Sequence, residues 1–192
     1  MAKPTFLPDK PDFTPANIPP EYLQAIGHLV VAFSFLEMNL QTAIHGLARM
    51  VDSEYGAALT THMTGPTRLS ALESVAELTL NDLPKIIEVE DLIRAVRKSS
   101  AQRADYVHAF WSRDRETNEV YTSRYESRTG LTVKMSRPSI TAITREAEAA
   151  TNLGVKLWSF VNDAGLLPPK TPIRPRGHKI KRKRKKFRKS AK

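Results

Sequence analysis

The sequence of 192 residues contains no cysteine, so it has neither a disulfide framework nor a thiolate metal site. This composition fits a reducing compartment, and we expect a cytoplasmic protein. The N-terminus lacks the charged start and continuous apolar core of a signal peptide, since prolines interrupt it. The most apolar stretch, residues 26–40, contains His28, Glu37 and Asn39 and is too short to cross a bilayer. We therefore expect no membrane span.

The common catalytic and cofactor motifs are also missing. The chain has no glycine-rich phosphate loop, no closely spaced set of metal ligands and no serine elbow. Its five histidines are scattered, and His28, His45 and His62 are assigned no role. We expect neither a metal nor a cofactor.

Acidic residues are absent from one end of the chain. Residues 170–192 hold 13 of the 30 Lys and Arg and no acid, whereas the other 169 residues carry 17 bases and 20 acids. A block of like charges cannot bury enough apolar surface to fold. The sequence therefore predicts a disordered polybasic tail over residues 167–192 and a mildly acidic folded body.

Three partners suit such a tail: a nucleic-acid backbone, a nuclear-localisation receptor or an anionic lipid surface. Between Lys179 and Lys189 only Ile180 and Phe187 interrupt the charge, so no apolar face is available to enter a membrane. This favours nucleic acid, bound without sequence preference and with strong salt dependence. The residues expected to contact phosphates are Lys179, Lys181, Arg182, Lys183, Arg184, Lys185, Lys186, Arg188 and Lys189.

The apolar pattern predicts a mainly α protein with one folded domain over residues 19–166. Four prolines indicate an extended arm over residues 1–18, which Phe6, Leu7 and Phe13 would hold against the domain. Three-and-four spacing predicts the helices. Their expected ranges are about 20–50, 54–62, 67–80, 85–113 and 139–164.

The spacing of the apolar residues changes between the expected helices over residues 85–113 and 139–164. Alternating residues on either side of an Arg-Thr-Gly turn predict a small β-hairpin over residues 119–136. Phe110, Trp111 and Trp158 stand at the spacing of core residues. With short links between helices, the whole pattern predicts a bundle of four to five helices.

One pair of residues remains as a candidate catalytic site. Arg103 and His108 stand in the run QRADYVHAFW, near the expected end of the helix over residues 85–113. A histidine exchanges protons near neutral pH, and a guanidinium binds phosphate oxygens with a planar fork. The pair suits metal-independent phosphodiester cleavage, in which histidine is the acid or base and arginine offsets charge on the phosphate.

Helix geometry separates these two side chains by about 140° around an ideal helix. Either the arginine reaches around, or the helix end is distorted, or two copies of the helix meet at a dimer axis and pool their residues. A two-fold axis is the simplest of these answers, so we expect a homodimer. The structural alternative pairs Arg103 with Asp105 or Glu37 on a solvated edge and gives His108 only a hydrogen-bonding role.

Glu37 on the first helix, a long later helix with R-x4-H followed by an aromatic pair, and a closing helix together resemble the HEPN superfamily over residues 20–165. HEPN domains are small helical bundles, usually dimeric. Many are metal-independent ribonucleases in bacterial toxin–antitoxin, phage-defence and RNA-processing systems, and others are non-catalytic binding modules. The resemblance implies that Arg103 contacts the scissile phosphate, that His108 is the acid or base, and that Glu37 orients Arg103.

The chain departs from the family pattern at one position. Ala104 stands where Asn, Asp or His commonly follows the arginine, and Asp105 comes one place later. The resemblance therefore implies a HEPN-type endoribonuclease, with or without an antitoxin partner, or a non-catalytic HEPN-like RNA-binding or scaffolding protein.

Overall fold

The computed structural model describes residues 11–50, 53–126 and 132–167. It contains helices α1 (Pro20–Leu47), α2 (Ser53–Thr60), α3 (Gly65–Thr79), α4 (Leu83–Val107) and α5 (Ile140–Asp163). Strands β1 (Pro11–Asp12), β2 (Phe110–Asp114), β3 (Val120–Glu126) and β4 (Thr132–Ser136), with the 3-10 turn η1 (Pro15–Asn17), complete it. The predicted mainly α class is confirmed. The predicted tail, with Lys179 to Lys189, lies outside the described residues.

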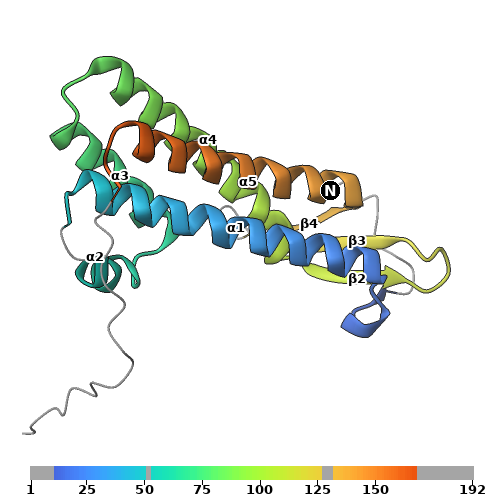
Figure 1. Ribbon diagram of the computed structural model, residues 1–192. Coiled ribbons are helices and arrows are strands. Elements are labelled where there is room, and N and C mark those ends of the chain that lie inside the picture. The colour runs from blue at the N-terminus through green and yellow to red at the C-terminus, as the bar shows by residue number, and fades with distance from the viewer. Residues whose placement is uncertain (1–10, 51–52, 127–131, 168–192) are drawn as a thin grey trace, which may run out of the picture.

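α1 and α5 form a parallel pair at the centre of the molecule (Figure 1). The Tyr22 hydroxyl, near the start of α1, donates to the carbonyl of Pro138, just before α5. Farther along, Gly154 of α5 lies against the ring of Phe35 on α1. At the end of α1, Gly46 lies against Val161 of α5 and the carbonyl of Leu166, which follows α5. The largest buried side chains of the core line this contact and include Leu29, Phe33, Leu36, Leu47, Ile143, Leu157 and Val161.

The buried face of α1 is narrower than the sequence pattern predicts. Leu23 and Val30, which follow the three-and-four spacing, and the neighbouring Val31 are exposed, Val31 by 67%. By length and composition α1 would pass as a membrane span, with a mean hydropathy of 1.4 and 39% of its most apolar window buried. The burial of its other face against α3 and α5 accounts for much of this apolar character.

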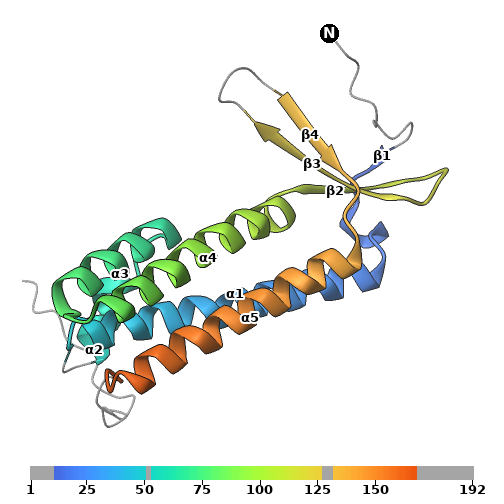
Figure 2. The ribbon, with the colours of Figure 1, turned by 90° about the horizontal axis from the view of Figure 1, so that it is seen from above.

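α4 runs back antiparallel to α5, and the four-stranded sheet then makes the return to the start of α5 (Figure 2). The strand order is β1-β2-β3-β4, and every neighbouring pair is antiparallel. The predicted hairpin is confirmed as β3 and β4, with residues 127–131 outside the described ranges. Figure 2 shows the sheet projecting from the end of the bundle where α1 begins.

The helix predicted to run to residue 113 ends instead at Val107. Residues Phe110–Asp114 pair with β3, and the indole N–H of Trp111 donates to the carbonyl of Tyr106 at 2.9 Å. This bond satisfies one of the four carbonyls that a helix end leaves without a partner. Trp111 also meets the ring of Tyr22 edge-on at 6.0 Å, so it joins the sheet to α1.

Two of the three aromatic residues assigned to the core are exposed. Phe110 is 57% exposed on β2, and Trp158 is 48% exposed on α5, whereas Trp111 is half-buried against the core. In a strand, neighbouring side chains point to opposite faces, so Phe110 and Trp111 cannot both face the core. Trp158 lies one place beyond Leu157, which takes the buried position.

The arm is held by a side chain that the sequence pattern did not single out. Phe13 is 57% exposed, and Phe6 and Leu7 lie outside the described residues. Asp12 instead accepts hydrogen bonds from the backbone of Thr14, from the side chain of Asn17 and from Arg115. These donors, Thr14 first, hold the pKa of the Asp12 carboxyl well below its usual range.

Two glycines of α1 give a matched test of the contact between α1 and α5. A β carbon at Gly46 would overlap the carbonyl oxygen of Leu166 and crowd Val161, whereas one at Gly27 would meet nothing within 4 Å. We expect Gly46→Ala to destabilise the fold by about 1–3 kcal/mol because the core is overpacked. Gly27→Ala should stabilise it by about 0.5–1 kcal/mol through helix propensity. Urea unfolding measures both, and equal effects would contradict the predicted contact.

Candidate active site

The motif helix α4 places Arg103 against α1. The guanidinium of Arg103 lies 5.2 Å from the ring centroid of Phe33, and its Nη1 is 3.9 Å from Oε1 of Glu37. Its side chain is 28% exposed. The predicted neighbourhood of Arg103 and Glu37 is therefore present, and the aromatic face of Phe33 adds a cation–π contact.

A second arginine, absent from the sequence prediction, joins this pair. Nη1 of Arg68 on α3 lies 3.3 Å from Oε2 of Glu37, and the Arg68 side chain is only 11% exposed. The two guanidiniums thus share one carboxylate, and the cluster of Arg68, Arg103 and Glu37 carries one excess positive charge. Sequence reasoning missed Arg68 because it belongs to another helix, 31 positions from Glu37.

Arg103 also retains an unused donor. Its Nε is buried and has no hydrogen-bond partner among the described residues. A buried donor without a partner costs about 1–3 kcal/mol. An anion at the exposed part of the Arg103 guanidinium would supply the missing negative charge, so the cluster suits a phosphate group.

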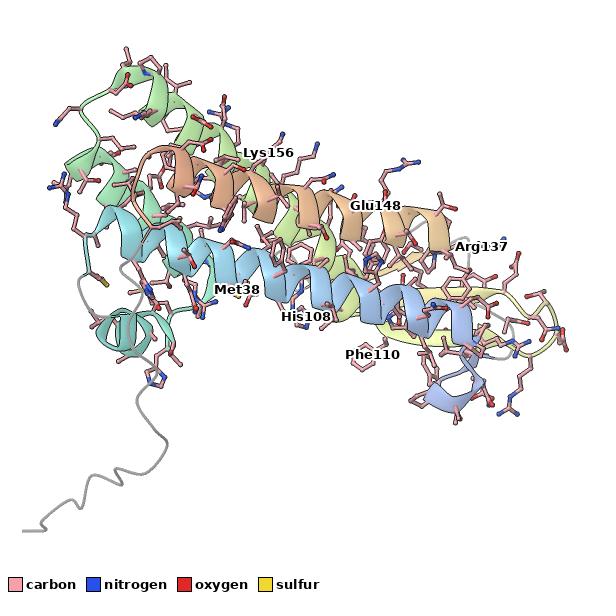
Figure 3. The ribbon with its side chains drawn as sticks, in the orientation of Figure 1. Met38, His108, Phe110, Arg137, Glu148 and Lys156 are labelled. Atoms are coloured by element: carbon pink, nitrogen blue, oxygen red, sulfur yellow. The ribbon has the colours of Figure 1, made fainter. Side chains whose placement is uncertain are left out.

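The sequence pattern predicts His108 inside the helix. In the structure His108 instead caps the C-terminal end of α4. Its φ and ψ angles are −105° and 6°, and its backbone N–H donates to the carbonyl of Ala104 at 3.3 Å. Its side chain is exposed and forms no hydrogen bond or ion pair with any of the residues the structure describes. In Figure 3, His108 and Phe110 are both labelled along the lower edge of α1. The imidazole is thus available to a ligand.

Asp105 is turned to the other side of α4. Its carboxylate accepts a hydrogen bond from Nη1 of Arg124 on β3 at 2.9 Å, so it supports the sheet and does not pair with Arg103. Asp105 and Tyr106 also line a pocket of about 190 Å³, to which β4 contributes Lys134. The pocket brings a further lysine to the same end of α4.

The remaining histidine inside the fold is structural. His45 is buried, and its Nε2 lies 3.1 Å from the hydroxyl of Thr60, which in turn donates to the carbonyl of Gly56. Burial is the main cause that lowers the pKa of His45 below its usual value. Over the described ranges, no group of three or more histidine and acidic side chains is arranged to hold a metal ion.

Comparisons with protein-family models, with curated proteins and with solved structures found no match. Over its described residues the chain is a mainly α protein with five helices and a four-stranded antiparallel sheet. The contacts of Arg103 with Glu37 and Phe33, together with the exposed side chain of His108, define its candidate site.

A double-mutant cycle tests the shared carboxylate. Glu37→Gln leaves two guanidiniums close together without their counter-ion, so we expect it to destabilise the fold by about 1–2 kcal/mol. Adding Arg68→Met should recover part of this loss, with a coupling energy above about 0.5 kcal/mol. The coupling with Arg103→Met should be smaller, since that contact is longer. Additive effects of Glu37→Gln and Arg68→Met in urea unfolding would contradict the arrangement.

Proposed function

We propose that this protein is a metal-independent endoribonuclease with a HEPN-like bundle, in which Arg103 binds the scissile phosphate and His108 transfers the proton. One observation carries the proposal. The guanidinium of Arg103 is fixed by Glu37 and Phe33, with an unpaired Nε, five residues before an exposed histidine without a side-chain partner in the described chain.

The reaction requires one proton to leave and one to arrive. A base removes the proton of the ribose 2′-hydroxyl, and the 2′-oxygen then forms a bond to phosphorus. The bond from phosphorus to the 5′-oxygen breaks, and an acid protonates that oxygen, which leaves a 2′,3′-cyclic phosphate and a 5′-hydroxyl end. Arg103 offsets the charge that develops on the phosphate oxygens, aided by the excess charge that Arg68 brings.

A homodimer supplies the second proton-transfer group. Each chain contributes one His108, so a two-fold axis near the end of α4 would place a base and an acid on opposite sides of the phosphate. The exposed side chains of Phe110 and Met38, 57% and 54% accessible, provide apolar surface near this end for such a contact. The tail, with Lys181, Arg188 and the other basic residues of 179–189, would hold the RNA.

A non-catalytic HEPN-like RNA-binding or scaffolding protein is the second candidate. Ala104 favours it, because this position is commonly polar in the family, and Asp105 cannot substitute while it is paired with Arg124. Roles in phage defence, or as a toxin held by an antitoxin, are proposed from the resemblance to the HEPN superfamily alone. Slower growth on expression, relieved by His108→Ala, would support the toxin role.

Cleavage in the presence of a chelator tests the catalytic proposal. Purified protein with EDTA should cut RNA and leave 2′,3′-cyclic phosphate ends. Loss of proton transfer in His108→Ala should slow cleavage by about 10²–10⁴-fold. His28→Ala, which changes an exposed histidine on α1, is the matched control and should keep the wild-type rate. Intact RNA with the wild type, or equal cleavage by His108→Ala, would refute the enzyme.

Deletion of residues 170–192 distinguishes the two candidate functions. Loss of 13 cations should weaken binding to long RNA by tenfold or more at low salt and should flatten the dependence of log K on log salt, which is about −0.7 per neutralised phosphate for single strands. Retained cleavage of a short oligonucleotide would support the enzyme. Loss of binding on deletion, with no cleavage by either the full chain or the shortened one, would support the tail-driven binder.

A further inference from the structure

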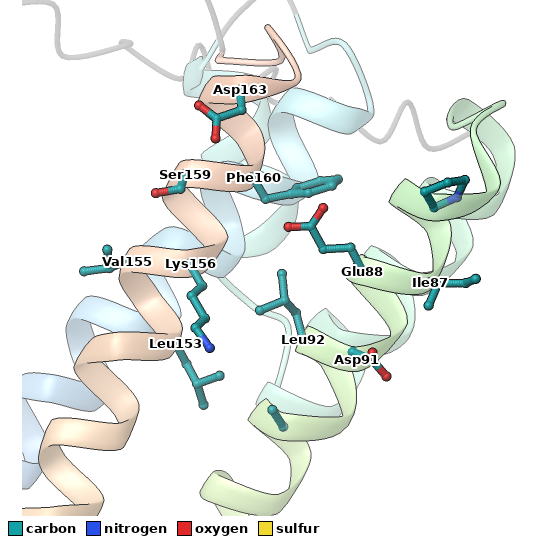
Figure 4. Close-up of a pocket in the computed structure, with 12 residues that line it drawn as sticks. Ile87, Glu88, Asp91, Leu92, Leu153, Val155, Lys156, Ser159, Phe160 and Asp163 are labelled. Carbon is teal, nitrogen blue, oxygen red and sulfur yellow. The ribbon is translucent and has the colours of Figure 1, made fainter.

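A groove of about 600 Å³ runs between the first half of α4 and the second half of α5, away from the Arg103 cluster. Its floor is apolar, since Leu92 and Phe160 are only 7% and 5% exposed and project toward the facing helix (Figure 4). Ile87 and Val155 lie along the rims and are about half exposed. An open apolar groove of this kind is suited to receive an extended segment.

The groove is negatively charged. Glu88 and Asp91 on α4 and Asp163 on α5 line it, with Lys156 as its one basic lining residue. Figure 4 shows the Glu88 side chain projecting from α4 toward α5. Across the ranges that the structure describes, neither Glu88 nor Lys156 forms an ion pair, and Asp91 pairs only with the exposed Arg94 of its own helix. The groove therefore favours a basic partner.

The described chain ends close to the groove, and in the sequence a basic segment follows. Asp163 is the last residue of α5, the backbone turns at Gly165 with φ of +65°, and the description ends at Leu167. The 25 residues beyond it can reach up to about 80 Å when extended, against about 16 Å for the groove-lining part of α4. A tether this short gives an effective concentration of roughly millimolar.

We propose that this groove is the docking site of the chain's own C-terminal segment 179–189. Ile180 or Phe187 lies over Leu92 and Phe160, and the neighbouring Lys and Arg side chains pair with the three carboxylates. Docking of the tail in the groove does not depend on the proposed function. Its effect on RNA binding does rest on the proposed function. RNA phosphates and the groove compete for the same cations, so the docked tail is withheld from RNA until a polyanion displaces it.

The absence of cysteine allows a direct test on the full chain. A nitroxide attached to an Ala191→Cys variant should reduce the NMR intensities of backbone amides along residues 84–95 and 153–163. The triple variant Glu88→Gln, Asp91→Asn and Asp163→Asn should abolish this effect, as should 0.5 M salt, which screens charges beyond about 4 Å. The control triple Glu77→Gln, Glu90→Gln and Glu148→Gln removes three exposed carboxylates outside the groove and should preserve it.

Three outcomes would overturn the proposal. They are unchanged amide intensities along the groove, equal effects in the two triple variants, and an effect seen only between spin-labelled and isotope-labelled chains in a mixed sample. The last would assign the groove to the tail of a second copy.

Affinity for a 12-nucleotide RNA tests the consequence separately. If the tail is docked for most of the time, the groove triple should bind RNA about three- to tenfold more tightly than the control triple at low salt. Equal affinities would overturn the competition. Should no variant bind RNA, the proposed function fails, while the spin-label result still decides whether the groove holds the tail.

Discussion

The parallel contact between α1 and α5 determines how the rest of the chain is arranged. Two parallel neighbours cannot be joined by a short turn, so the chain must return along the bundle between them. α4 makes that return, and the sheet reverses its direction. The end of α4 is therefore placed beside the sheet and against the middle of α1. Arg103 reaches Phe33 and Glu37 as a result of this connectivity.

The helices with strong apolar periodicity could be predicted from the sequence, because their burial depends on local spacing. Ser139 and Gly165 also mark the ends of α5 as local signals, the first through its bond to the backbone of Ala142 and the second through its positive φ. The end of α4 could not be predicted. Phe110 and Trp111 fit a helix as well as a strand, and the choice depends on pairing with β3, which is remote in sequence.

The same distinction applies to the candidate site. The neighbourhood of Arg103 and Glu37 could be predicted from a resemblance, but Arg68 carries no local pattern that connects it to either residue. Its place follows from the packing of α3 on α1, which brings a nearly buried guanidinium onto the Glu37 carboxylate. The orientation of Asp105 likewise depends on Arg124, a residue of the sheet. Non-local contacts of this kind have no signature in a single sequence.

The cluster of two arginines and one glutamate gives the fold a conflict between stability and recognition. A single carboxylate leaves the cluster under-neutralised, and the unpaired Nε of Arg103 adds to the cost. Replacing Arg103 by a neutral side chain of similar size would remove the buried Nε that has no partner, together with the charge that would attract an anion in the proposed function. Selection for a more stable protein would therefore favour a neutral residue at position 103, whereas selection for phosphate binding would favour arginine. A bound polyanion is the one change that satisfies both demands.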